Sequence, residues 1–90
     1  MAVNNMIEVL IYGNIRERVK ANHPNANAIL LCEYIEGEHL QDLLGRLGLK
    51  LADVGNCYVN NALANPNYVI HDRDTIELNQ PGHLAKEGFN

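Results

Sequence analysis

The side chains that could carry out chemistry in this 90-residue sequence are few and widely separated. The two cysteines, Cys32 and Cys57, lie too far apart to form a C-x-x-C pair. Both fall on strand positions predicted to face the core, where a free cysteine behaves as a small apolar side chain. We therefore expect buried structural thiols rather than reactive ones, which need an electropositive and partly exposed setting. The sequence contains no serine, which excludes a Ser-His-Asp nucleophile.

The segment "HDRD" brings three possible metal-ligand side chains, His71, Asp72 and Asp74, within four residues. A zinc site needs further converging ligands, and the sequence supplies none at a suitable spacing. We interpret the segment as a polar turn whose aspartates bond to the backbone, and we expect no metal and no cofactor. The paired acids Glu36 and Glu38 lie at the predicted strand-to-helix turn and have no apolar pocket nearby that would raise a pKa. We expect no enzymatic activity from so small a domain.

Composition and charge restrict the class of protein. An apolar share of 47% and a charged share of 20% are those of an ordinary globular domain. The net charge of -4 and the dispersed basic residues disfavour a nucleic-acid partner. The short basic run from Arg16 to Lys20 is interpreted as a solvated turn. No apolar run reaches the ~20 residues that span a bilayer, and "MAVNN" does not resemble a signal peptide, so we expect a cytoplasmic protein that binds no membrane.

The elements that must position these residues follow from periodicity. Strands are predicted over 6–13 and 28–37, separated by a loop whose front half could hold a helical turn. A leucine stripe at three- and four-residue spacing predicts a helix over 39–47, closed by Gly48 in a left-handed cap. A strand over 57–59 ends at an Asn60-Asn61 turn, and a short extended piece and the "HDRD" turn precede a last strand with Ile76 and Leu78 pointing inward.

This order predicts an α+β fold in which a mixed four- to five-stranded sheet packs on one main helix. A single helix covers one face of the sheet, so the other face is open. Leu10, Tyr12, Leu31 and Tyr58 are predicted to form an apolar patch there. Such a patch is typical of a partner surface, although isolated apolar residues on a surface are also ordinary.

The order of motifs resembles the MoaD/ThiS-like sulfur carriers of the ubiquitin-like β-grasp family. "IEVLIYGNIRE" is similar to the first strand and turn of that family, and "IEGEHLQDLLGRLGL" is similar to its first helix. "YVNN" stands where the family has Val-Asn-Gly, and "HDRDTIEL" where it has Asp-Gly-Asp and the last strand. The resemblance extends from Met6 to about Pro81. It implies a single β-grasp domain over residues 1–81. The tail, residues 82–90, is expected to be mobile because it holds few apolar anchors beyond Leu84 and Phe89.

The resemblance also implies chemistry at the C-terminus. In the family a final Gly-Gly is adenylated by an activating enzyme and converted to a thiocarboxylate, because only glycine passes its narrow channel. Here Pro81 matches a proline before the family's tail, but the glycine pair would fall near Leu84-Ala85. Gly82 and Gly88 are single glycines. Removal of the last two residues would make Gly88 the C-terminus, but the residue before it would be Glu87, where the family has glycine.

Two functions remain open. One is a protein-interaction module in, or derived from, a sulfur-transfer pathway of the molybdopterin or thiamine type. The other is a sulfur carrier activated as a C-terminal thiocarboxylate after trimming of the tail. In either case the expected partners are an activating enzyme, a larger synthase subunit or a second copy of the chain.

Overall fold

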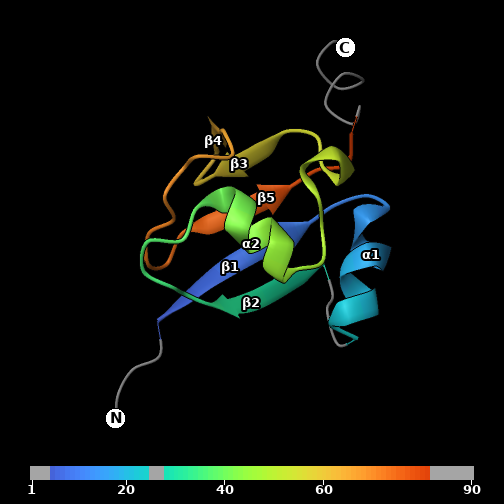
Figure 1. Ribbon diagram of the computed structural model, residues 1–90, viewed down its shortest axis with the longest axis horizontal. Helices are drawn as coiled ribbons and strands as arrows, with labels where there is room; N and C mark the ends of the chain where they lie inside the picture. Colours follow the sequence, from blue (N-terminus) through green and yellow to red (C-terminus); the bar gives the residue numbers. More distant parts are fainter. Residues whose placement is uncertain (1–4, 25–27, 82–90) are drawn as a thin grey trace.

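The computed structural model describes residues 5–24 and 28–81, which form one mixed five-stranded sheet and two helices. The element order is β1 (Met6–Ile11), α1 (Ile15–Asn22), β2 (Ile29–Glu33), α2 (Leu40–Arg46), β3 (Cys57–Val59), β4 (Ala62–Ala64) and β5 (Thr75–Leu78), with a 3-10 turn over Leu51–Asp53. The strands lie in the order β2-β1-β5-β3-β4, and only the central pair β1 and β5 is parallel (Figure 1). The predicted α+β class with a mixed sheet and one main helix is confirmed.

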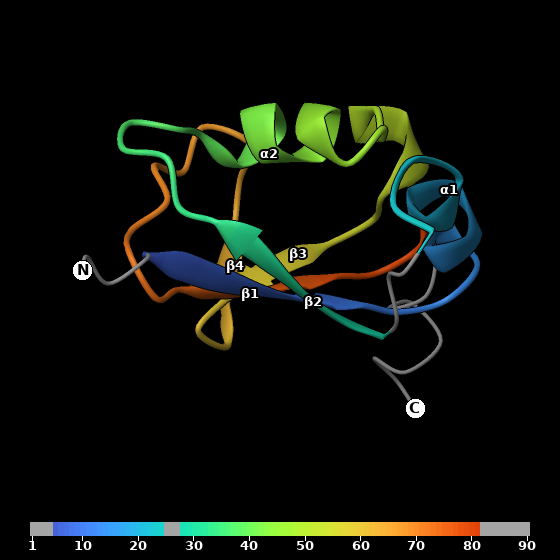
Figure 2. The same ribbon diagram turned by 90° about the horizontal axis from the view of Figure 1, so that it is seen from below.

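The core lies between α2 and one face of the sheet. Alternate residues of β1 and β5 point toward the helix, which presents its leucine stripe to them. The fully buried side chains of these elements are Ile7, Val9, Ile11, Leu40, Leu43, Leu44, Ile76 and Leu78, with Leu47 just beyond the helix. Figure 2 shows α2 along one face of the sheet and α1 beyond one end of it. The face opposite α2 carries no helix within the described residues.

The caps of α2 agree with the sequence. The helix begins after His39, whose backbone N–H donates to the Asp42 carboxylate at 3.0 Å. It ends before Gly48, which adopts φ +81°, a conformation that glycine enters at little cost. The N–H of Leu49 then bonds to the carbonyl of Leu44 at 2.8 Å and closes the last turn.

Three local predictions need correction. The run from Arg16 to Lys20 is not a turn but lies within α1, because Ile15 and Val19 are four residues apart and both are buried. The second strand ends at Glu33 rather than at residue 37, because the chain turns at Gly37 with φ +83°. The short strand lies at Ala62–Ala64 instead of before the "HDRD" turn.

The early position of that short strand follows from the Asn60-Asn61 turn. Both asparagines have positive φ, at 51° and 72°, which is the geometry of a two-residue hairpin. The chain therefore reverses at once and pairs β4 with β3. The extended piece that was predicted later makes a single bridge between Val69 and His39.

Neither described helix is long and apolar enough to cross a membrane, and no other candidate span occurs in residues 5–24 and 28–81.

Candidate functional site

The open face of the sheet carries one cross-strand row of side chains that reaches from edge to edge. Leu10 on β1 lies opposite Ile29 on β2 and Glu77 on β5. Tyr58 on β3 lies opposite the same Glu77 and also opposite Leu63 on β4. Ile29 and Leu63 at the two ends are 55% and 66% exposed, and the three central side chains are half-buried. The row, Ile29-Leu10-Glu77-Tyr58-Leu63, is apolar apart from one carboxylate.

A second row runs beside it. Leu31 on β2 lies opposite Glu8, which in turn lies opposite Thr75 on β5. Leu31 is 62% exposed, and the Thr75 hydroxyl donates to the Glu8 carboxylate at 3.5 Å. The open face thus presents apolar side chains around two carboxylates. Such a surface is complementary to a partner that offers apolar side chains and a cation.

The structure places the four predicted patch residues on this side of the molecule without making them contiguous. Leu31 and Tyr12 are exposed, whereas Leu10 and Tyr58 are half-buried. Leu10 and Tyr58 share a row but are separated by Glu77, because β5 lies between their strands. Tyr12 follows β1, and its N–H donates to the carbonyl of Leu78 at 3.0 Å.

Sequence reasoning missed two members of the row. Ile29 has the same strand parity as Leu31, so the period-two pattern already placed it on the open face. Leu63 could have been found from the Asn60-Asn61 turn, because a two-residue hairpin pairs the residue two before the turn, Tyr58, with the residue two after it, Leu63.

The residues that lead into the C-terminal segment are held firmly by the domain. Asn79 is 4% exposed, and its carbonyl accepts from the N–H of Gly55 at 2.7 Å. The Gln80 side-chain oxygen accepts from the backbone N–H of Asn14 at 2.7 Å. A Cβ atom on Gly55 would lie 2.7 Å from the Gln80 carbonyl oxygen and 3.0 Å from the Cα of Pro81, so this close approach requires glycine.

Of the predicted tail candidates, the structure places Pro81, which is exposed at the end of this anchored stretch. Gly82 and Gly88 lie outside the described residues. The prediction that residues 82–90 are mobile also concerns residues outside this range.

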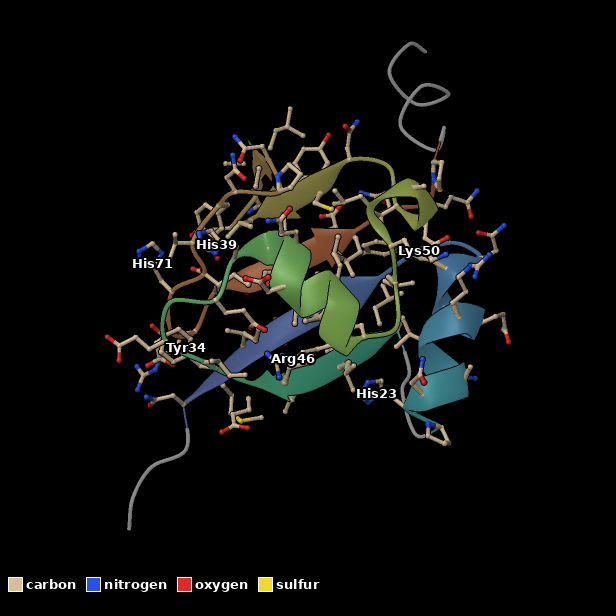
Figure 3. All side chains as sticks on the ribbon, viewed as in Figure 1. His23, Tyr34, His39, Arg46, Lys50 and His71 are labelled. Carbon is tan, nitrogen blue, oxygen red and sulfur yellow. The ribbon has the colours of Figure 1, made fainter. Side chains whose placement is uncertain are left out.

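A guanidinium connects α2 to the edge strand β2. The Nε and Nη2 atoms of Arg46 each donate to the Glu38 carboxylate at 2.8 Å, and Nη2 also donates to the carbonyl of Glu33 at 2.9 Å. Figure 3 shows Arg46 where α2 passes over β2. The hydrogen bond to Glu38 raises the pKa of Arg46, and the Glu38 side chain is only 6% exposed.

The cysteines have different environments. Cys57 is buried, and desolvation raises the pKa of its thiol to about 11. Cys32 is half-buried, so the prediction of a buried thiol holds only in part for this residue. Burial again raises the pKa of the Cys32 thiol, although the nearby Arg46 opposes that effect. Both thiols are held in the protonated, weakly nucleophilic form at neutral pH.

The "HDRD" segment forms the predicted polar turn. The Asp74 carboxylate accepts from the backbone N–H of His71 at 2.8 Å. Within the described residues no three His, Cys, Asp or Glu side chains are grouped so that they could hold a metal ion. Among the labelled histidines, His23 lies by α1, away from His39 and His71 (Figure 3).

A hollow of about 440 Å³ lies between α2, the 3-10 turn and the β3–β4 edge. Leu40, Leu44, Leu51, Val54 and Cys57 contribute to its mostly apolar lining. Of the lining that residues 5–24 and 28–81 provide, the one titratable side chain is the Cys57 thiol, whose pKa is raised by burial.

Comparison with known proteins identifies the fold. No family model and no curated protein sequence matches the chain. Among solved structures, small archaeal modifier protein 1 of H. volcanii is 13% identical with a TM-score of 0.65, and the match covers 86% of this chain and 98% of that one. A putative molybdopterin converting factor subunit 1 from Pyrococcus furiosus gives 17% identity, a TM-score of 0.65 and the same coverage. Urm1 from Trypanosoma brucei is 20% identical with a TM-score of 0.62, covering 92% of this chain and 98% of that one.

These identities are low, so what the matches establish is the architecture. The chain has the MoaD/ThiS-like, ubiquitin-like β-grasp fold, and the predicted resemblance is confirmed at that level. By their descriptions, one of the matched proteins is a small archaeal modifier protein and another is a putative molybdopterin converting factor subunit.

Proposed function

We propose that this chain is a β-grasp protein-interaction module that acts in, or derives from, a sulfur-transfer pathway of the molybdopterin or thiamine type. It works in the cytoplasm, binds neither nucleic acid nor membrane, and recognises an activating enzyme or a larger synthase subunit. The domain comprises residues 1–81, and the tail, residues 82–90, provides a second contact with the partner.

The observation that most supports this proposal is the row Ile29-Leu10-Glu77-Tyr58-Leu63 on the open face. The row crosses all five strands and takes an apolar side chain from four of them, two of which are more than half exposed; this is the kind of surface that association buries. Glu77 lies at the centre of the row, where a desolvated carboxylate discriminates strongly between a partner that offers a cation and one that does not.

The sequence around the tail supports a role in recognition rather than sulfur delivery. The 90 residues contain no two consecutive glycines, and Gly82 is followed by His83 and Leu84. A channel that admits only glycine would exclude those side chains. A trimmed sulfur carrier is the alternative, supported by the fold and by the anchored exit of the chain at Pro81.

Binding to the adenylating enzyme and the larger synthase subunit from the same organism tests the proposal. We expect the wild-type chain to bind one of them, and Glu77→Lys to weaken binding by about tenfold or more because the row loses its charge complement. Glu36→Lys is the matched control, since Glu36 is exposed on the turn before α2 and lies outside both open-face rows.

Adenylation measured in the same mixture distinguishes the two functions. The interaction module forms a complex without consuming ATP. Formation of an acyl-adenylate on the wild-type chain, or equal binding by Glu77→Lys and the wild type, would contradict the proposal.

A further inference from the structure

The strand β2 is one of the two edges of the sheet, and its outer side has an unusual composition for such a position. Its sequence Ile29–Glu33 reads ILLCE, with Ile29 and Leu31 exposed at 55% and 62%. Edge strands in globular proteins are commonly protected by lysine, proline or a bulge. None of these occurs in this strand, and its register with β1 is continuous over five residue pairs.

The hydrogen-bond pattern shows which backbone groups face outward. Tyr34 donates its N–H to Asn5, and Ile11 donates its N–H to Ala28, so the even-numbered residues of this stretch bond to β1. Antiparallel pairing alternates, and the N–H and C=O groups of Ile29, Leu31 and Glu33 therefore point away from the sheet. The Arg46 hydrogen bond to the Glu33 carbonyl confirms this direction.

Arg46 thus covers one end of the edge and leaves the other end open. Among the described residues, no hydrogen bond reaches the outward backbone groups of Ile29 or Leu31. These two residues supply two donors and two acceptors between exposed apolar side chains. An unpaired strand edge of this kind is a template for another strand.

We propose that the β2 edge pairs with the β2 edge of a second copy in antiparallel orientation, with Ile29 opposite Leu31 of the second copy. This register forms four backbone hydrogen bonds, two from each copy, and leaves the Arg46 bond to Glu33 intact. It also places two Ile–Leu pairs across the junction, and apolar cross-strand pairs of this kind stabilise a sheet.

The second copy fits better than an unrelated strand because the edge is complementary to itself. A two-fold axis turns each outward N–H of one copy toward an outward carbonyl of the other, as in an isologous interface. The chain carries a net charge of -4, but the stretch from Ile29 to Cys32 carries none, so the two copies do not repel each other at the contact. Glu33 lies beyond the paired residues.

The same register has a consequence for the open face. Residues opposite each other in an antiparallel pair point to the same side of the sheet. Ile29 and Leu31 both lie on the open face, so the open faces of the two copies become continuous and both α2 helices lie on the other side. The proposed dimer is a ten-stranded sheet whose central strands are the two copies of β2.

Sedimentation equilibrium of the full chain, from low micromolar to millimolar concentration, tests this proposal. We expect a reversible monomer–dimer equilibrium, and we expect Leu31→Lys and Ile29→Lys each to weaken dimerisation by about tenfold or more, since an ammonium group would enter the apolar contact twice per dimer. Leu63→Lys is the matched control. Leu63 is similarly exposed, at 66%, but lies on the opposite edge strand β4, so this variant should dimerise like the wild type.

Hydrogen exchange of the backbone amides supplies an independent readout. The backbone amides of residues 29 and 31 should exchange more slowly in the wild-type dimer than in the Leu31→Lys monomer. Circular dichroism checks that the wild type and the variant are both folded. A wild-type chain that stays monomeric, or a dimer that survives both lysine substitutions, would overturn the proposal. Either outcome would leave the proposed binding of a partner to the open face untouched, because that binding is measured separately with Glu77→Lys.

Discussion

At the scale of single residues, the Asp74 carboxylate ties together the turns at one end of the sheet. It accepts hydrogen bonds from the Tyr68 hydroxyl at 2.7 Å, the His71 backbone N–H at 2.8 Å and the Asn60 side chain at 2.8 Å. Burial by itself would raise the pKa of Asp74, but these three donors outweigh desolvation and lower it below its ordinary value. Burial, together with the hydrogen bond to the Asp74 carboxylate, raises the pKa of Tyr68 to about 12.

The lowered pKa of Asp74 makes stability depend on acid pH. Asp74 binds a proton less readily in the folded chain, so its contribution is complete above the ordinary value of 3.8 and is lost as pH falls through the lower folded pKa. We expect Asp74→Asn to cost about 1–3 kcal/mol of unfolding free energy near neutral pH, and this cost to shrink below pH 3.8. Urea unfolding as a function of pH measures the change. Asp72→Asn is the control, and a cost for Asp74→Asn that stays constant with pH would contradict the assignment.

The Arg46 guanidinium stabilises the fold by bonding to the Glu38 carboxylate and the Glu33 carbonyl. In Arg46→Ala, the Glu38 carboxylate, with its side chain 6% exposed, would lose its ion pair, and the Glu33 carbonyl would lose its donor. Because the Arg46 side chain is 31% exposed, solvent screens part of the loss, and we expect a cost of about 1–3 kcal/mol in urea unfolding. Arg18→Ala should cost under about 0.5 kcal/mol, since Arg18 is 63% exposed and 3.6 Å from Asp53. Equal costs for the two variants would refute this ranking.

The alternation of apolar residues indicates which side chains along a strand are buried. It does not indicate which distant side chains form hydrogen bonds or ion pairs with each other. The role of Asp74 in the "HDRD" turn could be predicted because an aspartate bonds locally to backbone groups. Its bonds to Asn60 and Tyr68 could not, because they depend on how the β3–β4 hairpin lies against β5. The Arg46–Glu38 pair could not be predicted either. The two residues are eight positions apart, and their contact depends on the path of the turn before α2.

At the scale of elements, substitutions at two glycines with different surroundings test the effects of backbone packing and of helix propensity separately. Gly55 lies against the backbone at the exit of the chain, and an added Cβ would lie 2.7 Å from the Gln80 carbonyl oxygen. We expect Gly55→Ala to cost about 1–3 kcal/mol, because neither backbone segment can yield as a side chain would. Gly45 lies inside α2 with no atom within 4 Å of its Cβ position, so Gly45→Ala should stabilise the chain by about 0.5–1 kcal/mol. Thermal unfolding of both variants measures the two effects, and destabilisation by Gly45→Ala or tolerance of Gly55→Ala would contradict them.

The elements differed in how well the sequence predicted them. The helix α2 was predicted within one residue at each end because its leucine stripe and Gly48 cap agree with its packing. The helix α1 was predicted only as a possible helical turn at the front of a loop, because only Ile15 and Val19 carry its apolar signal and the charged residues between them resemble a loop. The strand β4 was missed because Ala62–Ala64 has a weak strand signal, and only the hairpin geometry of Asn60-Asn61 specifies it.

At the scale of the whole molecule, the order of strands decides what the open face presents. Alternation along each strand predicted that Leu10 and Tyr58 face away from α2. It did not predict that β5, which comes last in the chain, would insert between their strands and place Glu77 between the two side chains. The change from a purely apolar patch to an apolar row with a central carboxylate is therefore a consequence of topology.

The intact mass of the protein purified from its own cells distinguishes an interaction module from a sulfur carrier. For an interaction module we expect a chain in which the residues after Gly82 are still present and in which no carboxyl oxygen has been replaced by sulfur. A chain that ends at Gly82 or Gly88 and carries a terminal thiocarboxylate would contradict it, and would identify a sulfur carrier instead of an interaction module.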